Sequence, residues 1–159
     1  MRIPTRQECY YIMYKMKMMD HIVAHSLQVC RVATFLADSL EADLNPDLVQ
    51  AAALLHDITK TRSIETHEDH AQTGKQFLIS LGYPRVGDIV GQHVLLDEYF
   101  ASDSPTEADV VNYADKRVVH DKVATRIYPD ALGENKNPGG TPVSFLFFFS
   151  RRYGKSPRA

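Results

Sequence analysis

Apolar residues recur along this chain with the spacing of amphipathic helices, and no segment alternates apolar and polar residues as a half-buried strand does. A first helix is expected to start at Thr5, with Glu8 completing a capping box, and to end near Met16. A longer helix, capped by Asp20, is expected to run to about Ala42. The pattern therefore predicts an all-α fold.

Cap residues, prolines and glycines divide the next part of the chain into further helices. The signals are Asn45 before Pro46, Thr66 as a second cap, and Gly82 just past a helix end. A loop is expected over the polar segment 59–65 and another over 96–104. The helices expected from these signals cover about 46–58, 67–81, 84–94 and 105–120.

The pattern changes toward the C-terminus. Segment 129–142 is rich in proline and glycine, which predicts a loop. The apolar run 143–150 that follows is either a last helix ended by Gly154 or a short buried strand. It is too short to span a bilayer, so we expect it to pack on a core or at a subunit interface, which leaves a homo-oligomer open.

Composition narrows the class of protein. The 159 residues suffice for one domain with a hydrophobic core, and the net charge of −2 predicts neither a nucleic acid polymer nor a membrane surface as partner. Two cysteines without CxxC spacing exclude a thiolate zinc site and a disulfide framework. The chain carries no secretory signal and no stretch of about 20 apolar residues, so a cytoplasmic protein is expected.

A histidine and an aspartate stand at the end of an apolar helical segment, in Ala-Ala-Ala-Leu-Leu-His56-Asp57. An unpaired carboxylate buried there would cost several kcal/mol. It must therefore be paired, hydrogen-bonded or bound to a metal. The alternative for this dipeptide alone is a helix-capping aspartate with a histidine packed beside it.

Two other apolar helices carry similar groups, His25 in one and Asp115 in another. Each has an ordinary alternative: a buried structural histidine, and an aspartate paired with Lys116 or Arg117. One cation, however, would satisfy the groups from all three helices together. Histidine and carboxylate ligands suit Mn, Fe, Co, Ni, Zn or, less well, Mg.

His70 and His93 fit the same scheme. With Asp57 as a bridging carboxylate they would complete a second metal site, and two metals can clamp a phosphate and activate a water. Gly74 and Gly91 would allow neighbouring backbone to come close. The alternative for each histidine is a surface or capping role.

Three motifs in this order, AHSLQVCRVA, AALLHDITK and NYADKRV, resemble the HD-domain metal-dependent phosphohydrolase superfamily over roughly residues 20–121. The resemblance implies a compact bundle of five or more helices with the metal site at its centre. It also implies one or two divalent ions. The metal ligands implied are His25, His56, Asp57 and Asp115, with His70 and His93 added in two-metal members.

The resemblance further implies catalytic roles for Asp57 and for Lys60, whose ammonium would meet the substrate phosphate or help the leaving group. Arg62, Lys116 and Arg117 are further candidate cations or solvated surface residues. His21 and His67 stand near His25 and His70 and compete with them for the ligand roles, but their downstream context matches the family less well.

The chain departs from the family pattern between residues 124 and 150, where relatives continue with a charged amphipathic helix. We therefore expect residues 1–125 to form the helical core and 126–159 an atypical extension that packs on or flanks it. This departure affects the outer wall of the site and any oligomer contacts, and leaves the metal ligands untouched.

The expected activity is hydrolysis of a small phosphoester, nucleotide or dinucleoside polyphosphate by a metal-activated hydroxide. One alternative is a mixed-valent diiron oxygenase on the same scaffold, which iron content and oxygen-dependent oxidation would reveal. Another is a non-catalytic metal- or nucleotide-binding regulatory domain, which absence of bound metal would favour. The cations near the site favour phosphate chemistry.

Overall fold

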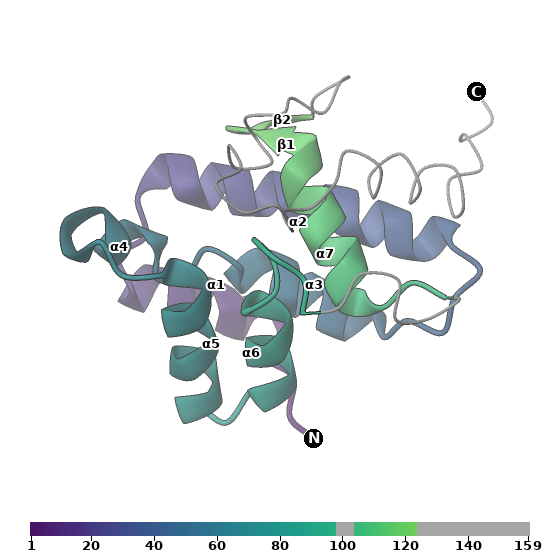
Figure 1. The fold of residues 1–159 in the computed structure, drawn as a ribbon, viewed down its shortest axis with the longest axis horizontal. Coiled ribbons are helices and arrows are strands. Elements are labelled where there is room, and N and C mark those ends of the chain that lie inside the picture. Colours follow the sequence, from purple (N-terminus) through teal and green to yellow (C-terminus); the bar gives the residue numbers. More distant parts are fainter. Residues whose placement is uncertain (98–103, 124–159) are drawn as a thin grey trace.

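Seven α-helices and one short hairpin make up the part of the chain that the computed structural model describes, residues 1–97 and 104–123. The hairpin pairs β1 (Val118–Val119) with β2 (Lys122–Val123) in antiparallel register. The expected all-α fold is confirmed. The helices are α1 (Arg6–Lys15), α2 (Asp20–Ser39), α3 (Pro46–Leu55), α4 (Lys60–Thr66), α5 (His70–Ser80), α6 (Pro84–Val90) and α7 (Glu107–Arg117) (Figure 1).

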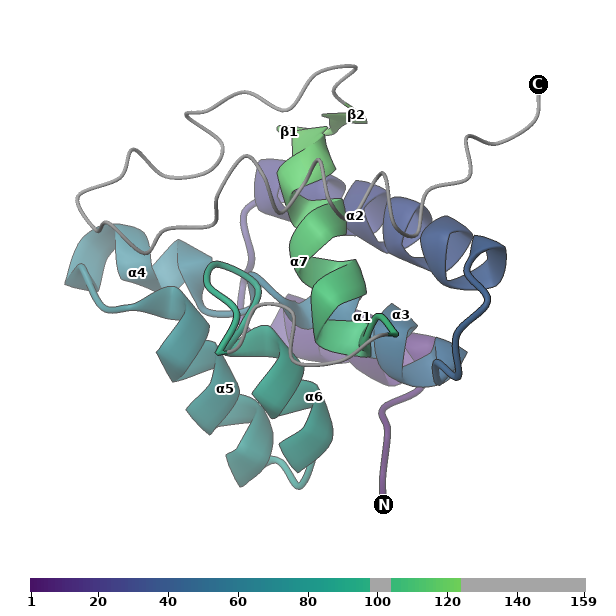
Figure 2. The same ribbon diagram turned by 45° about the vertical axis from the view of Figure 1, so that its right-hand side comes forward.

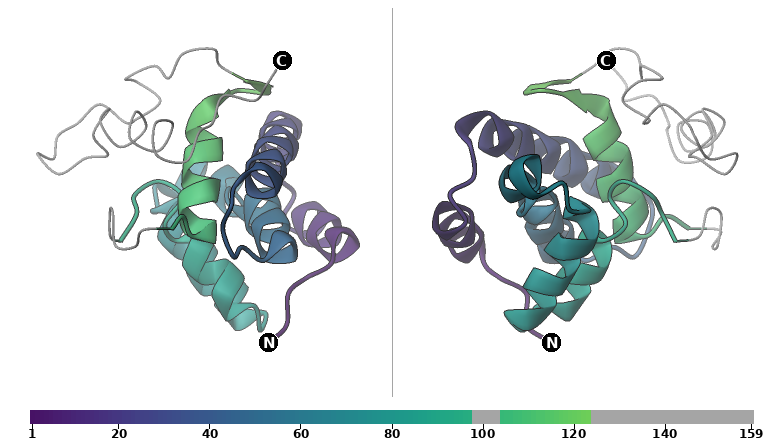
Figure 3. Two further views of the ribbon diagram at one scale, coloured as in Figure 1. Left: turned by 90° about the vertical axis from the view of Figure 1, so that its right-hand side faces the viewer. Right: turned by 60° about the vertical axis from the view of Figure 1, so that its left-hand side comes forward.

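Helix α3 is the centre of the bundle because its sequence is apolar nearly all round. From Leu48 to Leu55 every residue except the half-buried Gln50 is buried, and a helix of this kind is stable only when others cover it. Helices α1, α2, α6 and α7 all pack against it. In two further views α1 and α7 lie on opposite sides of α3 (Figure 3). None of the described helices combines the length and the apolar character that a membrane span requires.

Local capping fixes several helix starts. The Thr5–Glu8 capping box that the sequence predicts is present at α1. At α3 the Asn45 side chain accepts a hydrogen bond from the Leu48 amide, as expected. Helix α7 begins later than predicted, because Thr106 is its cap.

The expected loop over 59–65 is wrong, since these residues lie in or beside helix α4. This helix buries none of its residues, so it has no apolar stripe from which its period could be detected. The expected cap at Thr66 is wrong as well, because the Asp69 carboxylate accepts from the amides of Ala71 and Gln72 and starts α5.

Three more boundaries differ from expectation. Asp20 is the first residue of α2 rather than its cap, and α6 ends at Val90 instead of near Val94. The end of the predicted last helix is a hairpin, in which His120 takes a positive φ of 58° that Asn or Gly more often supplies in such turns. The predictions for residues 126–159 lie outside the described residues.

Helices α5 and α6 form an antiparallel pair joined at Gly82, and they lie side by side in two views (Figures 1 and 2). The backbones of the two helices lie close together at Gly87, where a Cβ would stand 2.8 Å from the Lys75 carbonyl oxygen. At Gly91 a Cβ would instead meet the flexible Lys75 side chain, also at 2.8 Å. Backbone cannot move aside as easily as a lysine chain, so the two glycines are not equivalent.

We expect Gly87→Ala to lower the free energy of unfolding by about 1–2 kcal/mol, because the clash with backbone exceeds the gain of up to about 1 kcal/mol in helix propensity. Gly91→Ala serves as the matched control and should be neutral or slightly stabilising. Urea denaturation of both variants and the wild type measures this difference. Equal stability of the two variants would contradict the close approach at Gly87.

Candidate metal centre

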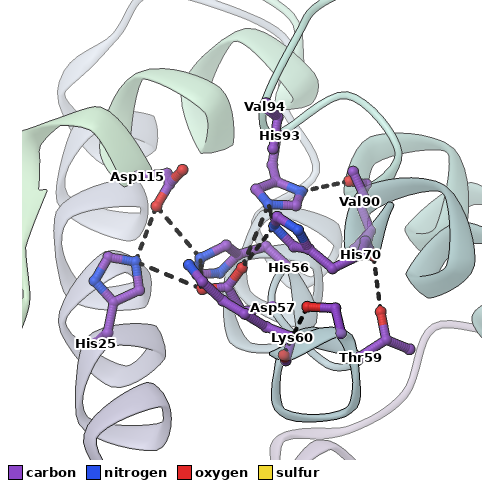
Figure 4. A network of polar contacts seen from close by, with 12 residues as sticks. His25, His56, Asp57, Thr59, Lys60, His70, Val90, His93, Val94 and Asp115 are labelled. Carbon is purple, nitrogen blue, oxygen red and sulfur yellow. Dashed lines mark hydrogen bonds and ion pairs between the residues drawn. The ribbon is translucent and has the colours of Figure 1, made fainter. Parts of the chain in front are cut away.

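Six histidine and aspartate side chains from five helical segments converge at one place in the bundle (Figure 4). The sequence singled out all six, and the structure brings all six together. They come from the middle of α2, the end of α3, the start of α5, the turn after α6 and the last part of α7. In that order they are His25, His56 with Asp57, His70, His93 and Asp115.

The six side chains form two groups that could each hold a metal ion, and within each group the candidate ligand atoms lie within 4.8 Å of one another. The first cluster is His25, His56 and Asp115. In it, Asp115 Oδ1 lies 2.9 Å from His25 Nε2 and 3.4 Å from His56 Nε2. Side chains that are 90 residues apart in the sequence are thus in direct contact.

The second cluster is Asp57, His70 and His93. Asp57 Oδ1 lies 3.3 Å from His70 Nε2 and 3.4 Å from His93 Nε2. The two Nε2 atoms are themselves 3.2 Å apart. At this distance one Nε2 can donate to the other if it carries a hydrogen, and a cation between them could accept both lone pairs.

Asp57 joins the two clusters. While Oδ1 faces the second cluster, Oδ2 lies 3.4 Å from His56 Nε2 and 4.0 Å from His25 Nε2 in the first. Its side chain is 1% exposed. One buried carboxylate therefore offers one oxygen to each cluster, which is the arrangement of a carboxylate that bridges two cations.

Backbone carbonyls fix the orientation of three of the four imidazole rings. Nδ1 of His25 donates to the His120 carbonyl over 2.6 Å, Nδ1 of His56 to Ala53 over 2.8 Å, and Nδ1 of His93 to Val90 over 2.7 Å. A carbonyl can only accept, so Nδ1 carries the hydrogen in each ring. In the neutral ring Nε2 then presents a lone pair to the centre, as metal-binding histidines do.

The two carboxylates of the centre favour a positive charge beside them. Burial opposes a charge on His56, but the Asp57 and Asp115 carboxylates outweigh it and raise the pKa of His56 to about 10. The facing imidazoles in turn hold the pKa of both carboxyls well below the usual range, against the effect of burial. Burial lowers the pKa of His93.

Two buried polar atoms of the centre, His56 Nε2 and Asp57 Oδ1, have no hydrogen-bond partner among the residues that the structure describes. A buried atom of this kind costs about 1–3 kcal/mol, and a divalent cation would satisfy both. The donors are imidazole nitrogens and carboxylate oxygens, a set that suits a divalent first-row metal. The residues present therefore fit a bound metal ion.

The neighbouring cations differ in their surroundings. Lys60 Nζ lies 2.8 Å from Asp57 Oδ2, and the lysine side chain is 42% exposed, so it stands where the centre meets solvent. Arg62 pairs with Glu68. Arg117 donates to the Tyr113 hydroxyl.

Of the two alternatives left open for Lys116, the solvated surface cation is wrong, because this lysine is buried and donates to backbone carbonyls. His21 and His67, the competitors for the ligand roles, are exposed and belong to neither cluster. The sequence did not predict that the His120 carbonyl accepts from the His25 ring. This role depends on the β1–β2 hairpin, which was not predicted either. Thr59, whose buried hydroxyl donates to the His70 carbonyl, was also not predicted.

The helical bundle thus carries two histidine–aspartate clusters that could each hold a metal ion. The HD domain family matches residues 22–118, a range that contains both clusters, and the chain belongs to this family. HD domains bind divalent metals, and the family lies within a superfamily of metal-dependent hydrolases.

Among individual proteins, the chain is similar to a tRNA (cytidine(56)-2'-O)-methyltransferase from Thermoplasma volcanium, with 37% identity over 93 residues. The match covers 58% of this chain and 26% of that protein. The chain thus spans about a quarter of the length of this relative. No solved structure matches the chain.

We expect cation binding near pH 7 to release about one proton, because His56, with a pKa of about 10, is protonated in the metal-free protein and must lose that proton to bind. Affinity should then rise about tenfold per pH unit below pH 10. Calorimetric titration in buffers of different ionisation heat measures the release. His56→Asn should abolish this proton release, and binding without any release by the wild type would contradict the assignment.

Proposed function

We propose that this chain is a metal-dependent phosphohydrolase that acts on a small phosphoester, a nucleotide or a dinucleoside polyphosphate. The observation that carries the proposal is the pair of clusters joined by the single carboxylate of Asp57. Two cations held a short distance apart in this way suit the attacking and leaving oxygens of a phosphoryl group.

The proposed ligands are His25, His56 and Asp115 for one ion and His70 and His93 for another, with Asp57 shared. Fe, Mn, Co, Ni, Zn and Mg are all compatible with these donors. When bound, the ions would activate a water molecule and neutralise charge on the phosphoryl oxygens.

The chain's own residues have distinct parts in this proposal. Asp57 is shared by the two clusters. The rings of His56 and His93 are buried, so bulk water does not reach them. Lys60 is the proposed contact to substrate. Its partly exposed ammonium can turn from Asp57 to a phosphoryl oxygen or to the leaving group as negative charge develops there.

The similarity to a tRNA methyltransferase bears on the choice of substrate. The matched segment is 26% of that protein, so its named activity does not carry over to this chain. The net charge of −2 favours a small substrate over a polymer. A substrate panel for this chain should nevertheless include tRNA beside small phosphoesters.

We expect protein loaded with Mn, Co, Ni or Fe to hydrolyse at least one phosphoester of such a panel and to lose the activity with a chelator. Asp57→Asn should reduce both cation binding and turnover by about 100-fold or more, because it removes the shared carboxylate charge. Asp38→Asn, an exposed position on α2, is the matched control and should behave like the wild type.

No hydrolysis by any metal-loaded form would contradict the proposed activity. Oxygen-dependent oxidation by the iron form would then favour a diiron oxygenase. Failure of the purified protein to bind any metal would favour a regulatory domain.

We expect Lys60→Met to lower kcat by about 10- to 100-fold with less effect on cation affinity, because the ammonium contacts the substrate rather than the metal. Steady-state kinetics on the best substrate, with metal content measured in parallel, separates the two effects. Lys15→Met removes an exposed lysine of α1, a helix that carries no group of the centre, and should leave kcat unchanged. An unchanged kcat in the Lys60 variant would contradict the assigned role.

A further inference from the structure

Helix α7 contacts the segment that carries His93 through two buried polar side chains. The amide nitrogen of Asn112 donates to the carbonyls of Gln92 over 3.0 Å and of His93 over 2.9 Å. The ammonium of Lys116 donates to the carbonyls of His93 and Val94, each over 3.2 Å. The His93 carbonyl thus receives two donors from one turn of α7.

These contacts matter because His93 lies beyond the end of its helix. Helix α6 ends at Val90, so the carbonyls that follow have no helical amide to accept from. Within the described residues of its own segment, 84–97, the hydrogen bonds of His93 are to Val90, through its amide and through its ring. Its position depends on support from another element, and α7 supplies it.

The two side chains are costly to bury. Lys116 is 4% exposed and Asn112 is fully buried, and within the described part of the chain the amide oxygen of Asn112 has no hydrogen-bond partner. An unpaired buried amide oxygen costs about 1–3 kcal/mol, and a buried ammonium needs strong acceptors. Apolar side chains would fill the same space without these costs, so the donors are present for the carbonyls that they bind.

We propose that Asn112 and Lys116 are positioning residues that fix His93 in the second cluster. The proposal rests on the metal centre put forward under the proposed function. Asp115 stands between them on α7 and belongs to the first cluster. One helical turn therefore contributes a ligand to one cluster and holds the backbone of a ligand in the other, so that the spacing of the two clusters is set by α7.

The proposal predicts that Lys116→Met changes the cation affinity of the two clusters differently. This substitution keeps the aliphatic part of the side chain and removes its hydrogen-bond donors. Cation affinity of the second cluster should fall by about tenfold or more, the range seen when supporting groups around metal ligands are removed. Affinity of the first cluster should stay the same or increase, because a positive charge next to Asp115 is lost. A purely structural role would weaken both clusters together.

The two clusters can be measured separately. His70→Ala leaves the first cluster intact and His25→Ala leaves the second, so each serves as a background for Lys116→Met. Cobalt titration followed by visible absorbance, with calorimetry, gives the affinity in each background. The expected result is tenfold or greater weakening in the His25→Ala background and none in the His70→Ala background.

Three further variants distinguish a local effect on cation affinity from a general loss of stability. Lys116→Arg keeps donors at this position and should recover part of the lost affinity, while Asn112→Leu should repeat the loss and replaces the lysine variant if that one fails to fold. Met13→Ala, a buried position on α1, which carries no group of the centre, should lower the melting temperature without changing either affinity.

Equal weakening in both backgrounds, or none in either, would overturn the positioning role. Wild-type protein that binds no cobalt would overturn both the metal centre and this proposal. Wild-type protein that binds two cations and hydrolyses no phosphoester would overturn the proposed activity alone.

Discussion

The buried carboxylate of Asp57 is the constraint around which this bundle is organised. Helix α3 is apolar nearly all round, and the residues directly after it place this carboxylate where it is 1% exposed. A charge in such a place costs several kcal/mol unless other groups compensate it. Imidazoles from α2, α5 and the turn after α6, together with Lys60, surround it at distances of 2.8 to 4.0 Å. These elements therefore meet at the end of α3 around one charge, which is also the middle of the candidate metal centre.

Two kinds of support keep the surrounding imidazoles in place. Main-chain carbonyls fix the protons of three rings. Side chains from other parts of the chain hold the backbone of two ligand-bearing segments: Thr59, just before α4, for His70, and Asn112 and Lys116 of α7 for His93. The centre therefore depends on the relative placement of α5, α6 and α7. The close approach of α5 and α6 at Gly87 is one determinant of that placement.

The sequence predicted the structure best where polar residues interrupt an apolar helical segment. The apolar segment that ends in His56-Asp57 predicted both a buried helix and a buried polar pair, and both are present. Helix α4 escaped prediction because none of its residues is buried, so its sequence has no apolar stripe. The burial of Lys116 could not be foreseen, since a lysine beside an aspartate on a helix usually faces solvent. That all six candidate residues lie together is seen in the structure, while their role as metal ligands stays a prediction.

The hairpin after α7 gives the His120 carbonyl a significance that its side chain does not have. It is the acceptor for the His25 ring, just as the carbonyls of Ala53 and Val90 are for His56 and His93. Every residue type has a carbonyl, so exchanging the side chain at any of these three acceptor positions leaves the acceptor itself in place. The path of the main chain therefore determines the tautomer of each ring. Substitutions at the acceptor positions change the tautomer only if they change the backbone conformation.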